Sequence, residues 1–294
     1  MTTLEVVAPG LRTLVQDAGR PGLAALGISA CGAWDRAAHE LGNRLVGNSR
    51  QAASLEVLLG GLQVRVHGGD LLIAVTGAEG PLSVDSRPAA LFSPVLVHDG
   101  QVIELGQVTR GLRRYLSVRG GIEGDRDFGS LASDPTRGLG LPVVKTGDEL
   151  AVGQAQGRVL GSGEMGGVVS HLREELSLRA VWGPRDDWFS TAGRQSFVDQ
   201  LWHVTDQADR VGSRLAGEPL EREVAGELAS EATVRGAVQV PASGLPVVFG
   251  PDHPTTGGYP VICVVDGPDA DLLSQAVPGQ KVRFLVSKPR VHLG

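Results

Sequence analysis

Acidic, imidazole and hydroxyl side chains are concentrated in one short segment near the end of the chain. It lies between the apolar runs 247–249 and 261–265 and carries Asp252, His253, Thr255, Thr256, Gly257, Gly258 and Tyr259. Its prolines restrict φ, and its paired glycines allow conformations and close approaches that side chains prevent. A rigid polar loop between buried strands suits the binding of a small polar substrate. A purely structural turn is the alternative interpretation.

A second candidate segment, Val15–Gly22, contains Gln16, Asp17 and Arg20. Two interpretations are open. Asp17 and Arg20 pair to brace a tight turn, or the Arg20 guanidinium binds a carboxylate or carbamoyl group through two hydrogen bonds.

The third segment places Asp209 directly before Arg210, with Arg214 four residues further on and Gly212 between the arginines. Exposed ion pairs explain this pattern, and so does an edge that binds an anion.

Several other motifs are excluded by their context. The segment 161–166 fits G-x-G-x-x-G, but the strand and helix of a dinucleotide-binding unit are missing around it. No Gly-Lys pair occurs, so a Walker A phosphate loop is absent. The seven histidines are dispersed, and two cysteines are too few for a disulfide framework or a cysteine-rich metal site. We therefore expect no metal site.

Charge and hydropathy exclude two classes of partner. The net charge is -6 and the basic residues are scattered, whereas nucleic-acid binding needs a concentrated positive face. No apolar run approaches the ~18 residues that a membrane span requires, and the N-terminus lacks the features of a signal peptide. We expect a cytoplasmic protein.

The elements that position these segments are mostly short strands. Glycine makes up 42 of 294 residues, about twice its average usage of about 7%. The glycines separate apolar runs of four to seven residues, which predicts a turn-rich β protein. A Gly-Gln or Gly-Asp turn precedes a strand at Gly100, Gly147 and Gly279. Helices are expected at 33–45, at 192–202 with Thr191 as N-cap, and after Asp269.

The domain organisation is indicated by a glycine-rich stretch that lacks strand alternation. We expect an N-terminal domain over 1–158, a linker over 159–170 and a C-terminal domain over 171–294. The repeated turn unit is compatible with two similar β modules.

These segments, in order, resemble one family: the KipA family, also described as the C subunit of 5-oxoprolinase, allophanate hydrolase subunit 2 or biotin-dependent carboxyltransferase-like. In the first half, the resemblance rests on residues 15–20, 27–35, 45–48, 55–57, 76–78, 115–121 and 129–130. In the second half, it rests on residues 209–215, 236–241 and 255–260. Together these motifs span nearly the whole chain.

The resemblance implies a mainly β fold of two cyclophilin-like β-barrel domains with a few short helices. It implies a KipI-like protein, the B subunit of the enzyme, as partner, joined by a LamB/YcsF-type protein, the A subunit. The joint activity would be the ATP-dependent opening of 5-oxo-L-proline, a small cyclic amide, to L-glutamate. ATP would be used at the level of the complex, and no biotin-attachment site is visible in this chain.

Opening a lactam with ATP is expected to proceed through a phosphorylated amide oxygen that water then attacks, which requires oxyanion donors, a cationic clamp and a base. Applied to this sequence, Asp17, Asp252, Thr255 and Thr256 are the catalytic candidates. The substrate-binding candidates are Gln16, Arg20, Asp209, Arg210, Arg214, Gly257, Gly258 and Tyr259. Pro254 replaces the Gln that the family commonly has before the Thr-Thr pair.

Two other functions remain open. One is an allophanate hydrolase or urea carboxylase-type carboxyltransferase subunit, which the related family names suggest. The other is a non-catalytic KipA-like antagonist of a kinase inhibitor. The sequence does not separate partner binding from catalysis, because both use the same partner surface.

Overall fold

The computed structural model describes residues 1–155, 158–159, 173–224, 226 and 228–287. The chain divides into two compact units, and each is described by itself. The N-terminal unit comprises Met1–Arg20 and Cys31–Leu172, and the C-terminal unit comprises Pro21–Ala30 and Arg173–Gly294. The expected linker over 159–170, including the G-x-G-x-x-G segment, lies outside the described residues except for residue 159. None of the helices in the described part is long and apolar enough to cross a membrane.

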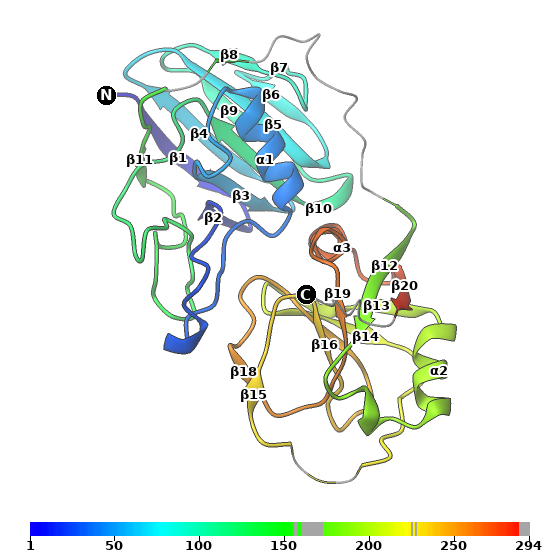
Figure 1. The fold of residues 1–294 in the computed structure, drawn as a ribbon. Helices are drawn as coiled ribbons and strands as arrows, with labels where there is room; N and C mark the ends of the chain where they lie inside the picture. Colours follow the sequence, from blue (N-terminus) through cyan, green and yellow to red (C-terminus); the bar gives the residue numbers. More distant parts are fainter. Residues whose placement is uncertain (156–157, 160–172, 225, 227, 288–294) are drawn as a thin grey trace. The chain divides into compact units, whose positions relative to one another are not determined.

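The described strands of the N-terminal unit form two antiparallel sheets (Figure 1). The six-stranded sheet has the order β11-β1-β4-β9-β6-β7, with β1 at Thr3–Pro9, β4 at Leu62–His67, β6 at Leu82–Val84, β7 at Arg87–Pro88, β9 at Val102–Leu105 and β11 at Glu149–Ala151. The five-stranded sheet has the order β2-β3-β10-β5-β8, with β2 at Arg12–Gln16, β3 at Ser54–Leu58, β5 at Leu71–Glu79, β8 at Val95–Val97 and β10 at Arg110–Val118.

Alternation along these strands produces the core of the N-terminal unit. In β4, Leu62, Val64 and Val66 are buried while the residues between them are partly exposed, because successive side chains point to opposite faces of a sheet. These residues join one apolar cluster with members from both sheets, including Leu55 of β3 and Ile103 of β9.

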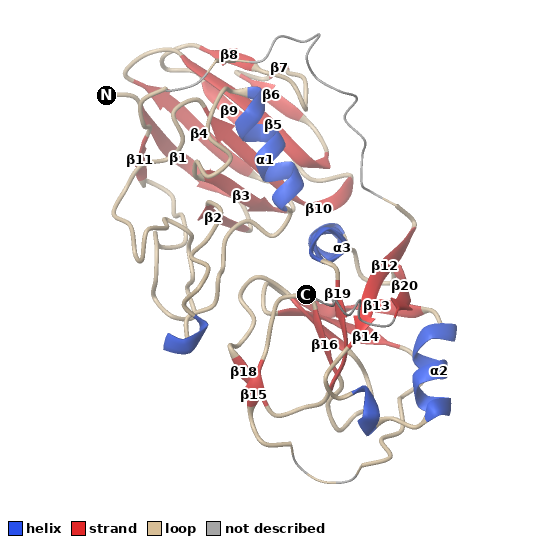
Figure 2. Cartoon of the chain, in the orientation of Figure 1, coloured by secondary structure: helices blue, strands red, loops and turns tan. Residues whose placement is uncertain are grey.

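One α-helix, α1 (Arg36–Leu45), packs against β5 and β10 (Figure 2). The expected start at residue 33 is wrong by three residues, because Asp35 is the N-cap and accepts a hydrogen bond from the Ala38 amide at 2.9 Å. The buried face of α1 includes polar His39 and Asn43. A short 3-10 turn, η1 (Ala24–Leu26), belongs to the C-terminal unit.

The C-terminal unit contains a closed barrel with the strand order β12-β19-β16-β17-β14-β13-β20. The strands are β12 (Glu175–Trp182), β13 (Trp202–Ala208), β14 (Gly212–Ala216), β16 (Ala237–Gln239), β17 (Val247–Phe249), β19 (Val261–Val265) and β20 (Lys281–Ser287). Outside the ring, β15 (Glu231–Ala232) pairs with β18 (Thr256–Gly257). The rings of Phe197 and Phe284 stack at 4.5 Å between centroids and are fully buried.

The remaining helices of the C-terminal unit are α2 (Thr191–Asp199), η3 (Asp186–Trp188), α3 (Gly267–Leu272) and η4 (Leu273–Gln275). The expected N-cap at Thr191 is wrong by one residue, since the Ser190 hydroxyl accepts the Gly193 amide at 3.0 Å. The third helix begins at Gly267, before Asp269, where Pro268 suits the first turn.

The prediction of a mainly β protein is confirmed. The glycines of the repeated turn unit adopt positive φ at Gly100 (81°), Gly147 (86°) and Gly279 (84°), and the turns lead into β9, β11 and β20. The sheets differ between the units: seven strands of the C-terminal unit form a closed ring beside the short β15–β18 pair, whereas the described strands of the N-terminal unit form two sheets.

Candidate functional site

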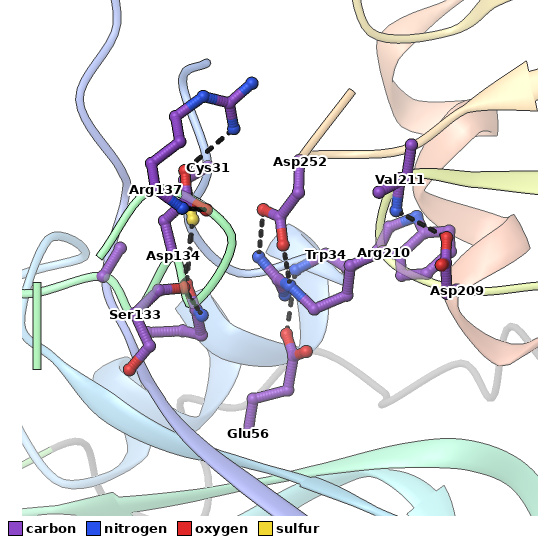
Figure 3. Close-up of polar contacts among 12 residues, drawn as sticks. Cys31, Trp34, Glu56, Ser133, Asp134, Arg137, Asp209, Arg210, Val211 and Asp252 are labelled. Carbon is purple, nitrogen blue, oxygen red and sulfur yellow. Dashed lines mark hydrogen bonds and ion pairs between the residues drawn. The ribbon is translucent and has the colours of Figure 1, made fainter. Parts of the chain in front are cut away.

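A buried ion pair in the C-terminal unit joins two residues that the sequence put forward separately. Arg210 precedes β14 and Asp252 follows β17, and these strands are antiparallel neighbours with Gly212 opposite Phe249. The Arg210 Nε donates to Asp252 Oδ2 at 2.7 Å and its Nη2 to Oδ1 at 2.9 Å (Figure 3). Both side chains are nearly buried, 5% and 6% exposed. Arg210, expected to bind an anion, is therefore paired with Asp252, which was expected to orient water.

Asp209 shapes the turn that presents Arg210. Its Oδ1 accepts the amide hydrogen of Val211 at 2.9 Å (Figure 3) and that of Gly212 at 3.2 Å, an arrangement in which Asp mimics a backbone turn. Arg214 lies on β14 opposite Val247 and is exposed. Asp209 is thus a turn-forming residue, and Arg214 is an exposed cation on the adjoining strand.

The histidine of the polar loop is packed rather than exposed. The His253 ring stacks on Phe249 with 5.8 Å between centroids, and Nδ1 lies 2.7 Å from the Pro254 carbonyl oxygen. Because a carbonyl only accepts, this contact places the proton on Nδ1. The Thr233 hydroxyl also donates to the Pro254 carbonyl. The ring is buried, stacked on Phe249 and hydrogen-bonded to the backbone of the same loop.

The two threonines of the loop leave their hydroxyls available. Thr256 pairs with Ala232 in the β15–β18 ladder, and the Thr233 amide donates to the Thr255 carbonyl at 2.9 Å. Thr256 is exposed and Thr255 is partly buried. Within the described residues, no protein group hydrogen-bonds either hydroxyl. Fixed backbone and unengaged hydroxyls are the properties needed to hold a polar substrate atom.

The Gln239 side chain packs closely against Gly257. A Cβ there would lie 2.3 Å from Gln239 Nε2, the atom that donates to the Tyr259 carbonyl at 3.1 Å. A Cβ at Gly258, by comparison, would come no nearer than 3.4 Å to the Leu228 carbonyl oxygen. The Tyr259 ring is 46% exposed. Thr255 to Tyr259 therefore form one continuous, braced and partly exposed segment.

In the N-terminal unit, Asp17 organises a distant loop. Its Oδ1 accepts the Ser130 hydroxyl at 2.6 Å and the Gly19 amide at 2.8 Å, and its Oδ2 accepts the Leu131 amide at 2.8 Å. The carboxylate is buried. Its oxygens are occupied by these donors, which suits a structural anchor better than a base that activates water.

Arg20 and Gln16 brace the same loop. The Arg20 Nη2 donates to the Ala132 carbonyl at 2.5 Å and its Nε to the Asp127 carbonyl at 3.3 Å. Gln16 Nε2 donates to the Ser133 carbonyl at 3.0 Å. The two side chains are almost fully buried. The proposed Asp17–Arg20 pair is not among the described ion pairs; both residues instead fasten the loop 127–133.

The structure also shows a buried polar network to which the sequence assigned no role. Glu56 Oε2 accepts the Trp34 amide at 3.0 Å and the Tyr115 hydroxyl at 2.8 Å (Figure 3 shows the Trp34 contact). The Tyr115 oxygen accepts the Asp35 amide at 2.8 Å, and the Arg113 guanidinium lies 4.2 Å above the Trp34 ring. A carboxylate at the centre of the apolar run Leu55-Glu56-Val57 was the available signal.

Burial perturbs the titration of this network. It raises the pKa of Tyr115 well above its usual range, and the neighbouring charges of Glu56 and Asp35 act in the same direction. Burial also lowers the pKa of His39 on α1 to about 4, against the opposing influence of Asp17 and Glu56. The network therefore holds a neutral imidazole and a protonated phenol at neutral pH.

Of the three arginines put forward as substrate-binding candidates, two are engaged within the chain, and Arg214 is exposed. Arg20 is committed to backbone carbonyls and Arg210 to Asp252, whereas binding of a phosphate requires donors that face the ligand. Across the described residues, no group of three or more His, Cys, Asp or Glu side chains is arranged to hold a metal ion.

Comparison with known proteins gives consistent relatives. The chain is 36% identical to the 5-oxoprolinase C subunit of Escherichia coli over 96% of this chain and 90% of that protein. It is 33% identical to the 5-oxoprolinase C subunit of Haemophilus influenzae over 93% of this chain and 87% of that protein.

Solved structures extend the comparison. The chain superposes on urea amidolyase of K. lactis with a TM-score of 0.89 and 26% identity, covering 97% of this chain and 18% of that one. For Kluyveromyces lactis urea carboxylase, the TM-score is 0.87 at 25% identity, over 97% of this chain and 27% of that one. The chain thus spans about a fifth to a quarter of these larger enzymes.

The sequence profile described as carboxyltransferase domain, subdomain A and B, matches residues 26–286. This match covers most of both units, including Arg210, Asp252 and the Thr255–Tyr259 segment. The chain therefore belongs to the carboxyltransferase domain family, subdomain A and B.

Proposed function

We propose that this chain is a subunit of an ATP-dependent 5-oxoprolinase, which opens 5-oxo-L-proline to L-glutamate and is active only with its partner subunits. The observation that carries this proposal is the collinear match to the E. coli C subunit, 36% identical over 96% of this chain and 90% of that protein. A match that nearly exhausts both chains supports the same role more strongly than one that covers a fraction of a larger enzyme.

The Thr255–Tyr259 segment is the proposed contact with the amide. The unengaged hydroxyls of Thr255 and Thr256 would donate to the lactam oxygen as it becomes negative, which lowers the barrier only if the donors are already fixed. The β15–β18 ladder fixes the backbone of Thr256, and the Thr233 amide holds the Thr255 carbonyl. Asp252, through its pair with Arg210, holds the base of this segment and acts as a positioning residue in this proposal.

The proposed partners are a KipI-like B subunit and a LamB/YcsF-type A subunit. Because Arg20 and Arg210 are engaged within this chain, we expect the partners to supply most of the phosphate contacts. The isolated chain should consequently be inactive.

A carboxyltransferase role toward a urea-like amide is the second candidate, favoured by the structural match to urea carboxylase at a TM-score of 0.87. A carboxyl group accepted on a urea nitrogen and a phosphoryl group accepted on a lactam oxygen both require donors placed around a small planar amide. The two functions therefore differ in substrate and co-substrate rather than in the kind of site.

The experiment is to purify the chain with its partner subunits and measure L-glutamate formed from 5-oxo-L-proline and ATP, with urea and carboxybiotin in parallel. Thr256→Ala should lower turnover of the complex at least about tenfold, the loss typical for removal of one fixed donor or somewhat less. Thr146→Ala, an exposed threonine in the N-terminal unit, is the matched control.

Glutamate formation that requires every subunit would support the proposal. A complex that forms no glutamate at saturating substrate and ATP would refute it. Carboxylation of urea in the same preparation would favour the second candidate, and a stable but inactive complex would favour the role of an antagonist of a KipI-like inhibitor.

A further inference from the structure

The N-terminal unit contains a polar pocket that the proposed function does not use. Its volume is about 320 Å³, and its lining includes Asn48, Gln51, Gly120, Glu123, Arg126 and Gln154. This volume is at the small end of the ~300–1,000 Å³ that is typical of ligand sites. A pocket of this size and polarity suits a compact, hydrophilic molecule.

The back of the pocket is rigid. The Asn48 side chain accepts the Gly120 amide at 2.8 Å and donates to the Val118 carbonyl at 2.7 Å. Gly120 has φ of 101°, and a Cβ there would lie 2.0 Å from the Gly153 carbonyl oxygen. Only glycine permits this approach, so the backbones at Gly120 and Gly153 pack directly against each other.

The two charged side chains of the pocket lie three residues apart in sequence and do not pair with each other among the described ion pairs. Arg126 makes its contacts through Nη1, at 3.8 Å from Asp17 Oδ2 and 3.4 Å from the Gly129 carbonyl. Within the described residues, its Nε and Nη2 have no protein acceptor. The Glu123 carboxylate likewise has no protein donor in that part of the chain.

Arg126 contacts the loop that Asp17 anchors. Asp17 fixes Ser130 and Leu131 by hydrogen bonds of 2.6 and 2.8 Å and attracts Arg126 from the same loop. The Glu123 carboxylate lies beside Gly153, with its Oε1 2.6 Å from the position that a Cβ on Gly153 would take. The pocket therefore presents a cation and an anion that remain unneutralised by one another.

We propose that this pocket binds a compact ligand that carries a carboxylate and an N–H donor, the chemistry shared by amino acids and their lactams. The ligand carboxylate pairs with the Arg126 guanidinium through its remaining donors, and the ligand N–H group donates to Glu123. An Arg–carboxylate contact adds both energy and orientation. A neutral lactam has no carboxylate for Arg126, and a simple carboxylate has no N–H group for Glu123.

The choice of probes rests on the proposed function, in which 5-oxo-L-proline is the substrate and L-glutamate the product. The charge pattern of the pocket is independent of that function. Binding of each probe to the full chain is measured by isothermal titration calorimetry. Acetate is a carboxylate without an N–H donor, and 2-pyrrolidone is a lactam without a carboxylate. The chain should bind 5-oxo-L-proline or L-glutamate at least about tenfold more tightly than either fragment.

Arg126→Gln and Glu123→Gln should each weaken binding roughly ten- to a hundredfold, the equivalent of one hydrogen bond to a charged group. The matched controls are Arg87→Gln and Glu149→Gln, exposed residues of the same unit outside the pocket, which should leave the affinity unchanged. Circular dichroism and the unfolding midpoint verify that each variant is folded.

Loss of affinity in both pocket variants and in neither control supports the proposal. The proposal is overturned if the folded wild-type chain binds neither 5-oxo-L-proline nor L-glutamate, or if both pocket variants bind these ligands as tightly as the wild type does. Turnover of the assembled complex is measured separately. Glutamate formation without ligand binding to this pocket refutes the proposed pocket function but not the 5-oxoprolinase activity. Binding without glutamate formation refutes the 5-oxoprolinase activity but not the pocket function.

Discussion

The buried His39 imidazole should make the folded protein sensitive to mild acid. Its Nε2 accepts from Asn43 Nδ2 at 3.2 Å, so its Nδ1 carries the proton and donates to Ser54 Oγ at 2.9 Å. Protonation of Nε2 would place its N–H donor against the Asn43 Nδ2 donor in a buried site. This geometry agrees with the lowering of its pKa from 6.5 to about 4, for which burial is the main cause.

The sign of the effect follows from proton counting. Between pH 6.5 and pH 4, the unfolded chain carries a proton on His39 and the folded chain does not, so acid favours unfolding. Stability is fully present above pH 6.5 and declines as the pH falls towards 4. With a His39 pKa of 6.5 in the unfolded chain and about 4 in the folded chain, lowering the pH from 7 to 5 reduces the free energy of unfolding by about 2 kcal/mol.

The assay is urea denaturation followed by circular dichroism at pH 7 and pH 5 for the wild type and His39→Gln. The variant is less stable at pH 7, because its amide does not reproduce both imidazole contacts, but its loss between pH 7 and pH 5 should be smaller by about 2 kcal/mol. His203→Gln, at an exposed position on β13, should retain the wild-type dependence. Equal losses for the wild type and His39→Gln would refute the reasoning.

Three further substitutions test the packing of the candidate segments. Asp252→Ala should destabilise the C-terminal unit by about 3–5 kcal/mol, because it removes the bidentate partner of a buried Arg210; an unchanged urea midpoint would contradict this. Gly257→Ala places a methyl group 2.3 Å from Gln239 Nε2 and should cost about 1–3 kcal/mol, whereas a Cβ at Gly267 meets no atom within 4 Å, so Gly267→Ala is the control in thermal unfolding. Tyr115→Phe removes the hydroxyl bonded to a buried carboxylate and should cost about 1.5–3 kcal/mol; a loss below about 0.5 kcal/mol in urea denaturation would show that the network contributes little.

Much of the fold was predictable because strand patterns and turns are local. The alternation in Leu62–His67 predicts a half-buried strand from adjacent residues alone. Helix boundaries were less accurate, since Asp35 and Ser190 compete with neighbouring residues for the capping position. Closure of the second sheet into a ring was not readable in this way, because it depends on pairing between β12 and β20, which lie at opposite ends of the C-terminal unit.

The candidate site shows the same division. Residue types and short spacing selected Asp17, Arg20, Arg210 and Asp252 as unusual, and all four are buried. Their roles depended on partners far along the chain: Asp17 binds Ser130 and Arg210 binds Asp252. The role of Glu56 is not predictable in this way, because one carboxylate in an apolar strand does not show that Tyr115 will lie beside it.

By itself, the sequence determined the β-rich architecture, the glycine turns at Gly100, Gly147 and Gly279, and the polar loop Thr255–Tyr259. Only the tertiary structure decided which charged groups form hydrogen bonds that stabilise the fold and which line a pocket. The physical reason is that a buried charge must find its partner wherever the fold brings one. Arg20 and Asp17 therefore became anchors, and Glu123 and Arg126 were left facing a pocket.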